Sequence, residues 1–371
     1  MILLLHNRYR LAGGEERAVA DLRWLIREEF GEDAEVLERD SAVLGSRRAA
    51  AGLLRGGLAP EDVAHAVRRT GARVVHAHNV NPSFGWRALA AARDAGARVV
   101  LHLHNYRLVC AQGLCFTRGE DCTRCHGRDT APGVRLNCRG GSRAESVVYA
   151  AGLSLWQRRL AANVDAFAVP SAFALRRLRE LGAPVGRRAH VIGSVQREIA
   201  GASRAAEGRF VLAAGRLTPE KGFDDAIDAA RAAGLALVVA GDGPHAAALR
   251  DRAAGADVRF TGALDPEALG ALRREAGAAV VPSRFAEILP LAALEAMAAG
   301  VPLAAADSGG LSEAVPAEGL YPAGDAGALA ACLRALWRDA GAGERGLALV
   351  RERYSPAAVA AQLREVYDGA G

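Results

Sequence analysis

Two cationic residues that follow a short apolar run are the first candidates for chemistry in this 371-residue chain. Arg216 and Lys221 lie five positions apart in the segment GRLTPEKG, directly after the apolar run that begins at Phe210. Such a pair can hold a diphosphate and stabilise the negative charge that grows on a departing nucleotide. Of the 47 basic residues, 46 are arginine, so the one lysine indicates a need for a compact ammonium group at position 221.

Two carboxylates further along the chain have a spacing that suits a sugar and a ribose. Seven residues separate Glu287, predicted on a loop after a strand, from Glu295, predicted inside a helix that starts near Pro290. A carboxylate inside that helix can accept two hydrogen bonds from a ribose diol. Free backbone N–H groups at the helix start, around Leu289 and Leu291, can bind sugar hydroxyls or phosphate oxygens.

Glycines and paired polar residues follow the strands predicted for the first half of the chain. Gly13 and Gly14 come between the first strand and a helix that begins near Glu15, where backbone amides can approach a phosphate. Three predicted strands end in the dipeptide His-Asn, at His6–Asn7, His78–Asn79 and His104–Asn105. Because these pairs stand at the ends of parallel strands, we expect them to line one edge of a pocket.

The cysteines are concentrated in one segment. Five of the six lie between positions 110 and 138, and Cys332 stands alone in a helical stretch. The four that fit a tetrahedral structural zinc site, in the spacing C-x11-C-x2-C-x12-C, are Cys110, Cys122, Cys125 and Cys138. Cys115 and His126 are spare candidates. In a cytoplasmic protein such a cluster favours a metal over disulfides, with free thiols or a disulfide as the alternatives.

Charge is distributed unevenly along the chain. Residues 1–193 carry 29 arginines against 19 acidic residues, a net charge of +10, whereas residues 194–371 have a net charge of −5. A basic first half suits an anionic acceptor or membrane surface, and an Arg-rich solvated surface explains it equally well. No apolar run approaches the roughly 20 residues of a membrane span, and the opening MILLLH is typical of a strand rather than a signal peptide. We therefore expect a cytoplasmic protein, with peripheral contact at the inner membrane face left open.

Short apolar runs alternate with amphipathic stretches along the chain, which indicates parallel strands covered by helices. A first series of strands is predicted at 2–7, 34–39, 72–79, 97–105, 164–171 and 188–194. After a linker-like stretch at 195–208, a second series is predicted at 210–216, 236–243, 258–262, 278–283 and 302–308. We expect an N-terminal Rossmann-like domain at 1–194 with a Cys-rich insertion at about 106–141. A C-terminal one should follow at 195–355, and a last helix at 356–371 should pack back toward the N-terminal domain.

Taken together, these motifs resemble those of the family-4 retaining glycosyltransferases with the GT-B fold, also called glycosyl transferases group 1, in the subgroup with a Cys-rich insertion after the fourth strand. The resemblance is carried by G-R-L-x-x-E-K-G at 215–222, by E-x7-E at 287–295 with E-A-M-A-x-G-x-P at 295–302, and by G-G-L-x-E at 309–313. It implies an α/β fold of two doubly wound domains that face each other across a cleft. It also implies transfer of a sugar, with retention, from a nucleotide-diphosphate sugar (a UDP-sugar is favoured) to an acceptor hydroxyl, with no catalytic metal.

The resemblance also implies roles for individual residues. Arg216 and Lys221 would bind the donor diphosphate, Glu295 the ribose, and Glu287 the donor sugar, while His104 would be the catalytic imidazole. The other donor-binding positions that it implies are Gly13, Gly14, Gly241, Leu289 and Leu291. The residues expected on the acceptor side are His78, Asn79, Asn105 and Tyr106.

Two other functions stay open from the sequence alone. One is a hydrolase, epimerase or phosphorylase of the same two-domain build that acts on a nucleotide sugar. The other is a zinc-containing nucleic-acid-binding protein, suggested by C-x2-C and the Arg-rich first half. The sequence lacks the interleaved aromatic residues typical of such a protein, since aromatic residues make up only 5% of the chain. Nucleic-acid binding also leaves the glutamate pair unexplained. The expected partners are therefore a nucleotide-sugar donor and a carbohydrate, lipid-linked or small-molecule acceptor, and no nucleic acid.

Overall fold

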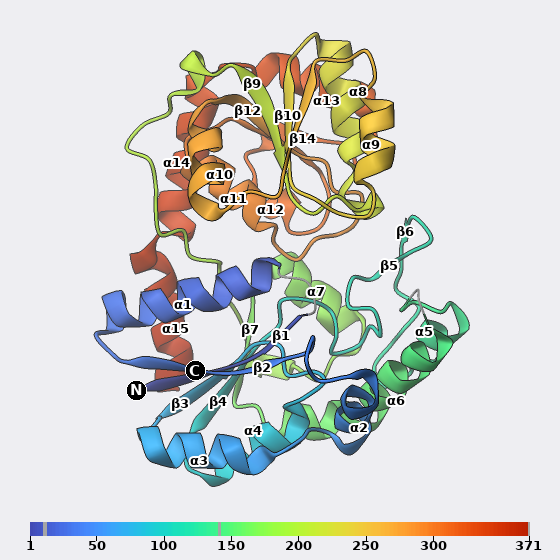
Figure 1. The fold of residues 1–371 in the computed structure, drawn as a ribbon. Coiled ribbons are helices and arrows are strands. Elements are labelled where there is room, and N and C mark those ends of the chain that lie inside the picture. The colour runs from blue at the N-terminus through green and yellow to red at the C-terminus, as the bar shows by residue number, and fades with distance from the viewer. Residues whose placement is uncertain (10–12, 140–141, 370–371) are drawn as a thin grey trace. The chain divides into compact units, whose positions relative to one another are not determined.

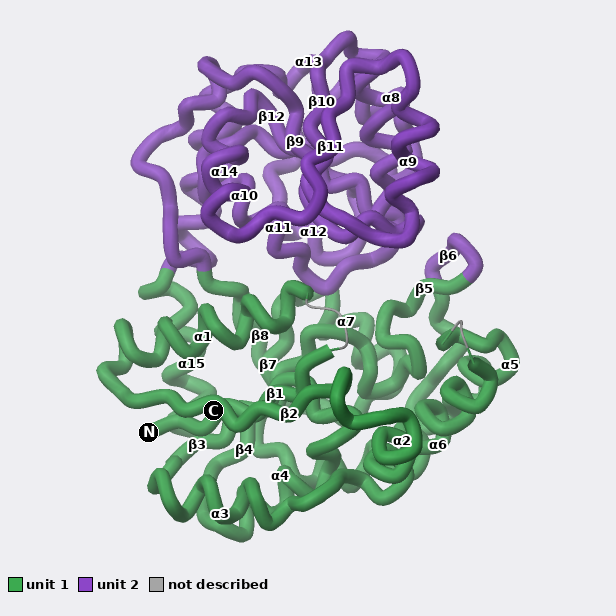
Figure 2. Tube along the Cα trace, viewed as in Figure 1, with its two compact units in different colours: residues 1–117, 122–195, 356–371 green, residues 118–121, 196–355 purple. Residues whose placement is uncertain are grey.

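The computed structural model of the chain describes residues 1–9, 13–139 and 142–369, and it divides into two compact units. Unit 1 comprises residues 1–117, 122–195 and 356–371, and unit 2 comprises residues 118–121 and 196–355 (Figure 2). Each unit has its own parallel six-stranded sheet and its own core. The α/β class with two parallel sheets that the sequence predicts is therefore confirmed.

The sheet of unit 1 has the strand order β2-β1-β3-β4-β7-β8, and every neighbouring pair is parallel. Its strands are β1 (Ile2–Arg8), β2 (Ala34–Asp40), β3 (Val74–Ala77), β4 (Arg98–His102), β7 (Ala166–Val169) and β8 (Ala189–Val191). Its helices are α1 (Gly14–Phe30), α2 (Ser46–Arg55), α3 (Pro60–Thr70), α4 (Gly85–Asp94), α5 (Ala131–Arg135), α6 (Arg143–Ala162), α7 (Ala172–Glu180) and α15 (Pro356–Asp368). A short hairpin, β5 (Phe116–Thr117) and β6 (Glu120–Asp121), interrupts the segment after β4.

Helices cover both faces of this sheet, which explains why its central strands are apolar on both sides. α1 and α15 lie along one face, where they share a core with β1, β3, β4 and β7, and α3 and α4 lie side by side on the other (Figure 1). The last helix therefore belongs to unit 1. Its Tyr367 is buried, and the hydroxyl lies 2.7 Å from Nδ1 of His76 on β3.

The sheet of unit 2 has the order β11-β10-β9-β12-β13-β14, again with all pairs parallel. Its strands are β9 (Phe210–Ala214), β10 (Leu237–Ala240), β11 (Val258–Gly262), β12 (Ala276–Val281), β13 (Leu303–Ala306) and β14 (Leu320–Tyr321). Its helices are α8 (Phe223–Ala233), α9 (Ala246–Arg252), α10 (Pro266–Arg274), α11 (Leu291–Ala298), α12 (Leu311–Ala314), α13 (Ala326–Leu336) and α14 (Ala340–Arg353). Strand β14 has only two residues, which is too few to be recognised as a strand in the sequence.

The chain after β9 differs from the expected local structure. The predicted strand at 210–216 ends already at Ala214, and Lys221 closes a 3₁₀ turn at Pro219–Lys221. Gly222, with φ of +68°, then separates that turn from α8. Several helices begin with a side chain that accepts a backbone N–H, as expected for Ser and Asp at such positions, among them those that follow Ser142, Ser171, Asp265, Asp325 and Asp339.

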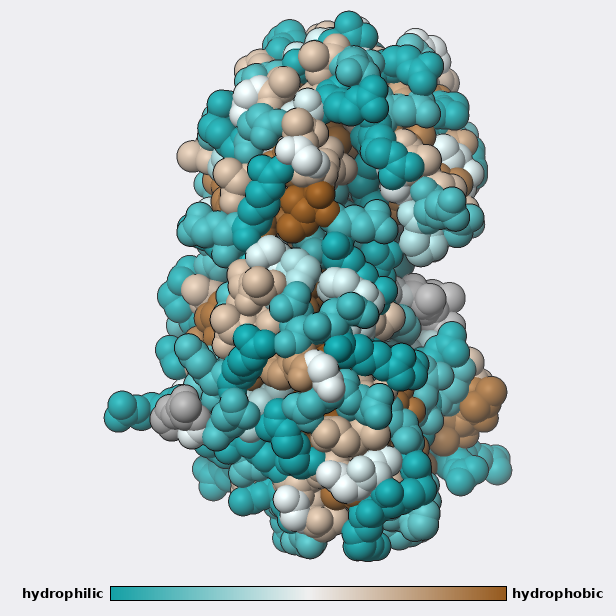
Figure 3. All heavy atoms as spheres, turned by 90° about the vertical axis from the view of Figure 1, so that its left-hand side faces the viewer, coloured by the Kyte–Doolittle hydropathy of each residue, from teal (hydrophilic) through white to brown (hydrophobic). Residues whose placement is uncertain are grey.

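In the described part of the chain, few large apolar side chains are well exposed. They are Val43, Leu54, Val147, Leu155, Val191 and Leu264. On the face shown in Figure 3, hydrophobic residues gather in small separate groups among hydrophilic ones, as is normal for a protein surface. In the parts of the chain that the structure describes, no helix has the length and apolar character that crossing a bilayer requires.

Candidate functional site

Lys221 and Glu287 form an ion pair at the C-terminal edge of the unit 2 sheet. Lys221 follows β9, and Glu287 stands on the loop after β12, its neighbour in the sheet. Lys221 Nζ donates to Glu287 Oε1 at 2.8 Å, and the Ser283 hydroxyl donates to the same oxygen. Because Glu287 is buried and Lys221 half-buried, the carboxylate is held in place while the ammonium keeps protons for a further acceptor.

Three glycines allow the loops that carry this pair to approach closely. A Cβ at Gly222 would lie 2.0 Å from the carbonyl oxygen of Pro282, just before Ser283. Gly309 and Gly310 follow β13, and a Cβ on either would overlap the backbone around Glu287. Gly310 N also donates to the Glu287 carbonyl oxygen at 2.7 Å. The glycines in GRLTPEKG and GGLSE thus fix the backbone around the ion pair.

Arg284 ties the same loop to the start of α8. Its guanidinium donates to both oxygens of Asp225, at 2.9 and 2.5 Å, and to Asp224 at 2.5 Å. Despite the burial of the group, these two carboxylates raise the pKa of Arg284 above its ordinary value. The motifs of the sequence do not indicate this network, although an acidic pair that begins three residues after the only lysine is a usable signal.

Arg216 has no role in these contacts and is exposed on the loop after β9. Within the described residues, no hydrogen bond or ion pair of its guanidinium is found. Gly241, predicted to contact the donor, lies against this loop: a Cβ there would be 1.9 Å from the carbonyl oxygen of Gly215. Gly241 therefore shapes the backbone that presents Arg216.

Glu295 lies inside α11 and pairs with Arg273 near the end of α10. Both side chains are largely buried, at 19% and 11% exposure. Pro290 precedes the helix without a side-chain cap, so the first N–H groups of α11, beginning at Leu291, lack the partner that a cap would supply. Leu289 and Leu291 are half-buried at this helix start.

In unit 1, four imidazoles stack at the ends of β3 and β4. The distance from His78 Nδ1 to His104 Nε2 is 2.7 Å, and that from His76 Nε2 to His102 Nδ1 is 3.3 Å. The rings of His102 and His104 stack with centroids 4.0 Å apart. Burial, followed by the neighbouring imidazoles, lowers the pKa of His78 and His104 well below the ordinary value, and burial lowers that of His102 to about 3. These imidazoles are therefore neutral at physiological pH.

The polar residues expected on the acceptor side have different positions. His78, Asn79, His104 and Asn105 all line one cavity of unit 1. Tyr106, in contrast, is 1% exposed and is not among the lining residues. The pair His6–Asn7 lies inside β1, which runs on to Arg8, and does not reach the cavity. Two of the three His-Asn pairs are thus brought together there, because β1 extends beyond its pair while β3 and β4 end before theirs.

Gly13 and Gly14 stand at the start of α1, and residues 10–12 before them lie outside the described part of the chain. The Glu16 carboxylate accepts the Gly13 N–H at 2.7 Å and the Tyr9 N–H at 3.2 Å. Burial alone would raise the pKa of Glu16, but contact with His6 and these N–H groups lowers it to about 2.

The neighbouring carboxyl group, that of Glu15, has a raised pKa instead of a lowered one. It accepts the Tyr9 hydroxyl at 2.7 Å and lines the same cavity as the histidines. Burial raises its pKa to about 7, against the lowering effect of the Tyr9 hydrogen bond and of nearby His6 and Arg107. In the sequence Glu15 marks only the start of a helix, and its position beside the segment after β4 becomes visible in the fold.

All five clustered cysteines of unit 1 line one small cavity. They are Cys110, Cys115, Cys122, Cys125 and Cys138, and no disulfide joins them in the described part of the chain. His126 does not join them: its ring lies against Gly182, where a Cβ would be 2.7 Å from Cε1. Sulfur ligands in such number suit zinc by type, with Cys115 as the fifth candidate. Among the described residues, however, only His78, His102 and His104 have three ligand atoms within 4.8 Å of one another.

Comparison with known proteins gives matches to both units. The family description "Glycosyl transferase 4-like domain" matches residues 9–194, and "Glycosyl transferases group 1" matches residues 208–339. Glycogen synthase of Mycobacterium tuberculosis is 41% identical over 155 residues, which are 38% of this chain and 37% of that protein. Phosphatidyl-myo-inositol mannosyltransferase of Mycobacterium leprae is 34% identical over 176 residues, 43% of this chain and 46% of that protein. The chain thus spans less than half the length of these relatives.

Solved structures resemble the whole chain. Sucrose-phosphate synthase from Thermosynechococcus elongatus has a TM-score of 0.71 at 18% identity and covers 100% of this chain and 98% of its own. Anabaena HepE in complex with UDP and glucose has a TM-score of 0.66 at 17% identity, with 99% of both chains covered. At such identities the likeness concerns the fold, which is that of GT-B glycosyltransferases. With one family match over half of its length and a second over most of unit 2, the chain belongs to the glycosyltransferases of group 1 with the 4-like N-terminal domain.

Proposed function

We propose that the protein is a retaining glycosyltransferase that moves a sugar from a nucleotide-diphosphate sugar to an acceptor hydroxyl. The observation that carries this proposal is the ion pair of Lys221 and Glu287 at the C-terminal edge of the unit 2 sheet, with Arg216 exposed on the same loop as Lys221. Ligands of doubly wound folds bind at that edge. The arrangement offers two cations for a diphosphate and a buried carboxylate for a sugar.

In the proposed complex, Arg216 and Lys221 neutralise the donor diphosphate, and N–H groups at the start of α11 add to its binding. Glu295 accepts hydrogen bonds from the ribose diol, and Glu287 holds the donor sugar. On the acceptor side, His104 is the proposed catalytic imidazole, with His78, Asn79 and Asn105 around it. These side chains supply the charge neutralisation, so catalysis is proposed to need no metal.

The reaction forms a bond between the acceptor oxygen and the anomeric carbon, and it breaks the bond from that carbon to the diphosphate. Attack on the same face as the leaving group retains the configuration. The acceptor proton passes to the departing diphosphate, whose growing charge Arg216 and Lys221 stabilise. This route suits a site whose carboxylate, Glu287, already bonds to Lys221 and Ser283 and is thereby held away from a nucleophilic role.

A UDP-sugar is the favoured donor in this proposal. HepE has been solved with UDP-glucose, whereas a relative that is 39% identical over 110 residues is a GDP-mannose-dependent mannosyltransferase of Mycobacterium tuberculosis. Both bases therefore occur among similar proteins. The acceptor would be a carbohydrate, a lipid-linked molecule or a small metabolite. We propose a cytoplasmic setting, with peripheral contact at the inner membrane face where the acceptor is lipid-linked.

A screen of UDP-, GDP-, ADP- and dTDP-sugars for thermal stabilisation of the purified protein tests the donor class. We expect one nucleotide family to raise the melting temperature of the wild type and not that of Lys221→Ala. No shift with any of the nucleotides would contradict the proposal. Product analysis with and without acceptor then separates a transferase from a hydrolase, because only a hydrolase releases free sugar at full rate without acceptor.

A further inference from the structure

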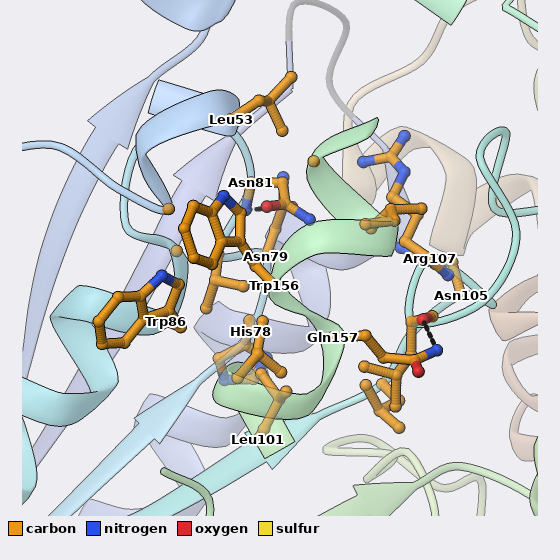
Figure 4. Close-up of a pocket in the computed structure, with 18 of the residues that line it drawn as sticks. Leu53, His78, Asn79, Asn81, Trp86, Leu101, Asn105, Arg107, Trp156 and Gln157 are labelled. Carbon is orange, nitrogen blue, oxygen red and sulfur yellow. Dashed lines mark hydrogen bonds between the residues drawn. The ribbon is translucent and has the colours of Figure 1, made fainter. Parts of the chain in front are cut away.

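A cavity of about 690 Å³, part of it open to solvent, lies within unit 1 beside the ends of β3 and β4. Its wall is formed by α2, by the start of α4, by the second half of α6 and by the segment after β4. Figure 4 shows side chains from these elements around one space, among them Trp86 from α4 and Trp156 from α6.

The helical side of this cavity is apolar and aromatic. The side chains that form it include Leu53, Trp86, Leu153, Trp156 and Leu160. The indole rings of Trp86 and Trp156 lie 5.8 Å apart at an angle of 39°. Gly56 at the end of α2 lets Trp86 lie directly against the helix, because a Cβ there would be 2.1 Å from the indole Nε1. Such a wall binds an apolar ring or chain.

The opposite side offers hydrogen-bonding groups that lack partners. In the described part of the chain, Nε2 of His78 and Nε2 of His102 are buried without a hydrogen bond, although these residues are only 3% and 8% exposed. The indole Nε1 of Trp86, which belongs to the apolar side, is likewise buried without a hydrogen bond in the described part of the chain. Buried polar atoms are rarely left unpaired, because burial removes their hydrogen bonds to water and nothing replaces them. A neutral imidazole nitrogen pairs well with a hydroxyl, which both donates and accepts.

Charge is scarce around this cavity. Among the lining residues only Glu15 and Arg107 are ionisable apart from the neutral histidines. Glu15 accepts the Tyr9 hydroxyl, and the Arg107 guanidinium lies 4.8 Å from the centre of the Tyr9 ring, with its Nε left without a hydrogen-bond partner in the described part of the chain. Outside the lining, the Arg159 guanidinium lies 5.2 Å from the ring centres of both Trp86 and Trp156. A wall of this kind does not favour a multiply charged ligand such as a phosphate, even though the first half of the chain is basic.

A metal ion is a weaker candidate for the same histidines. The ligand atoms of His78, His102 and His104 lie within 4.8 Å of one another. However, the three rings are nearly parallel, with angles of 12°, 13° and 22° between their planes. Because the lone pairs lie in the ring planes, stacked imidazoles do not converge on a single ion. Their geometry is that of hydrogen bonding and stacking.

We propose that this cavity binds the acceptor, and that the acceptor is a hydroxyl-bearing molecule with an uncharged aromatic or alkyl body. The body lies against Trp86 and Trp156, and a hydroxyl meets the unpaired nitrogens of His78 and His102. This proposal rests on the glycosyltransferase function proposed above, because that function requires an acceptor hydroxyl. It narrows the acceptor from any carbohydrate or lipid-linked molecule to one whose reacting end carries an apolar group.

Binding of three probes to the full chain, measured by calorimetry without any nucleotide, tests this proposal. The probes are biphenyl-4-ol, n-octyl β-D-glucoside below its micellar concentration, and glucose. We expect the first, the second or both to bind and glucose not to bind. Biphenyl-4-ol alone would indicate a free aromatic acceptor, and the octyl glucoside alone would indicate an alkyl chain. Glucose binding as tightly as the apolar probes would overturn the proposal.

The variants are Trp156→Ala and, as a control on the same helix, Leu155→Ala, whose side chain is 51% exposed. Trp156→Ala should weaken probe binding at least about tenfold, and Leu155→Ala should leave it unchanged. Retained nucleotide stabilisation in Trp156→Ala shows that the variant is folded. Probe affinity that Trp156→Ala leaves intact would contradict the proposed site. If the wild type binds no nucleotide, the proposed function is overturned. Probe binding is measured without the donor, so this result is distinct from a failure of the proposed acceptor site.

Discussion

Lys221, the only lysine of the chain, donates a hydrogen bond of 2.8 Å to Glu287, a residue 66 positions later in the sequence. The two strands that precede these residues, β9 and β12, are neighbours in the sheet, although β10 and β11 come between them in the chain. The crossover thus places a cation predicted to hold phosphate next to a carboxylate predicted to hold sugar. A substitution that breaks this ion pair should therefore impair both the binding of the phosphate and the binding of the sugar.

Replacing Lys221 with Ala should lower kcat/KM by about 10²–10³-fold, because one charged donor to the leaving diphosphate is lost. Lys221→Arg should recover only part of this activity, since a planar guanidinium cannot occupy the same position beside Glu287. Steady-state kinetics with the donor found in the nucleotide screen measure both. Full activity in Lys221→Arg would mean that any positive charge is sufficient at this position.

Glu295→Gln should weaken nucleotide binding and also destabilise unit 2. The substitution removes the charge that faces the largely buried Arg273, so we expect a loss of about 1–3 kcal/mol in the free energy of unfolding. Urea unfolding and a nucleotide titration measure the two effects. The matched control is Glu207→Gln in the exposed pair with Arg204, which should change neither. Normal nucleotide affinity in Glu295→Gln would contradict the ribose-binding role.

The sequence predicts the strands of the fold better than it predicts the contacts between the residues of the site. Eleven predicted strands correspond to strands of the two sheets, because buried parallel strands are continuous apolar runs. The motif residues Lys221 and Glu287 stand out by type and spacing. Their direct ion pair does not, since it depends on strand order and on the close approach that Gly222 and Gly309 permit.

The arrangement of the histidines in unit 1 is likewise not predictable from the sequence. His78 and His104 stand out in the sequence because each precedes an Asn, whereas nothing in the sequence distinguishes His76 and His102 from other strand residues. In the structure, β3 and β4 lie side by side, and alternation along each strand brings all four rings to one face. The cavity beside them depends on Trp86 and Trp156, which are distant in sequence and could not be associated without the fold.

Stability should depend on pH through Glu15. Its pKa of about 7 lies above the ordinary value of 4.5, so the folded state keeps a proton that the unfolded state has already released between those values. The free energy of unfolding therefore falls as the pH rises from 4.5 to 7 and stays level above. Glu15→Gln keeps an acceptor for Tyr9 and should stabilise the protein by up to about 3 kcal/mol at pH 8, with little effect at pH 4.

The adjacent Glu16 provides a control of opposite sign. Its pKa is lowered to about 2, so its contribution is present above pH 4.5 and is lost as the pH falls toward 2. Glu16→Gln should therefore destabilise the protein at pH 8. Thermal unfolding between pH 4 and pH 8 measures both variants. A constant difference between Glu15→Gln and the wild type across that range would contradict the buried state of Glu15.

We propose that the thiols around the small cavity of unit 1 hold a structural zinc. The purified protein should contain one zinc per chain by mass spectrometry of its metal content, and Cys125→Ser should lose it and melt at a lower temperature. Cys332→Ser in unit 2 is the control and should retain the metal. Cys115→Ser decides whether the fifth thiol is a ligand. Full thermal stability of a zinc-free preparation would contradict a structural role.

Gly222 and Gly234 allow a direct test of how the Lys221 loop is positioned. They have nearly the same backbone conformation, with φ of +68° and +69°, so Ala should cost about 1–2 kcal/mol at either position through strain alone. A Cβ at Gly234 meets no atom within 4 Å, whereas one at Gly222 would lie 2.0 Å from the Pro282 carbonyl oxygen. We therefore expect Gly222→Ala to lose about 1–3 kcal/mol more than Gly234→Ala, and to lose activity as well, because relief of the overlap separates Lys221 from Glu287. Urea unfolding and steady-state kinetics of the two variants check this, and equal losses in both would mean that this loop adapts without moving the ion pair.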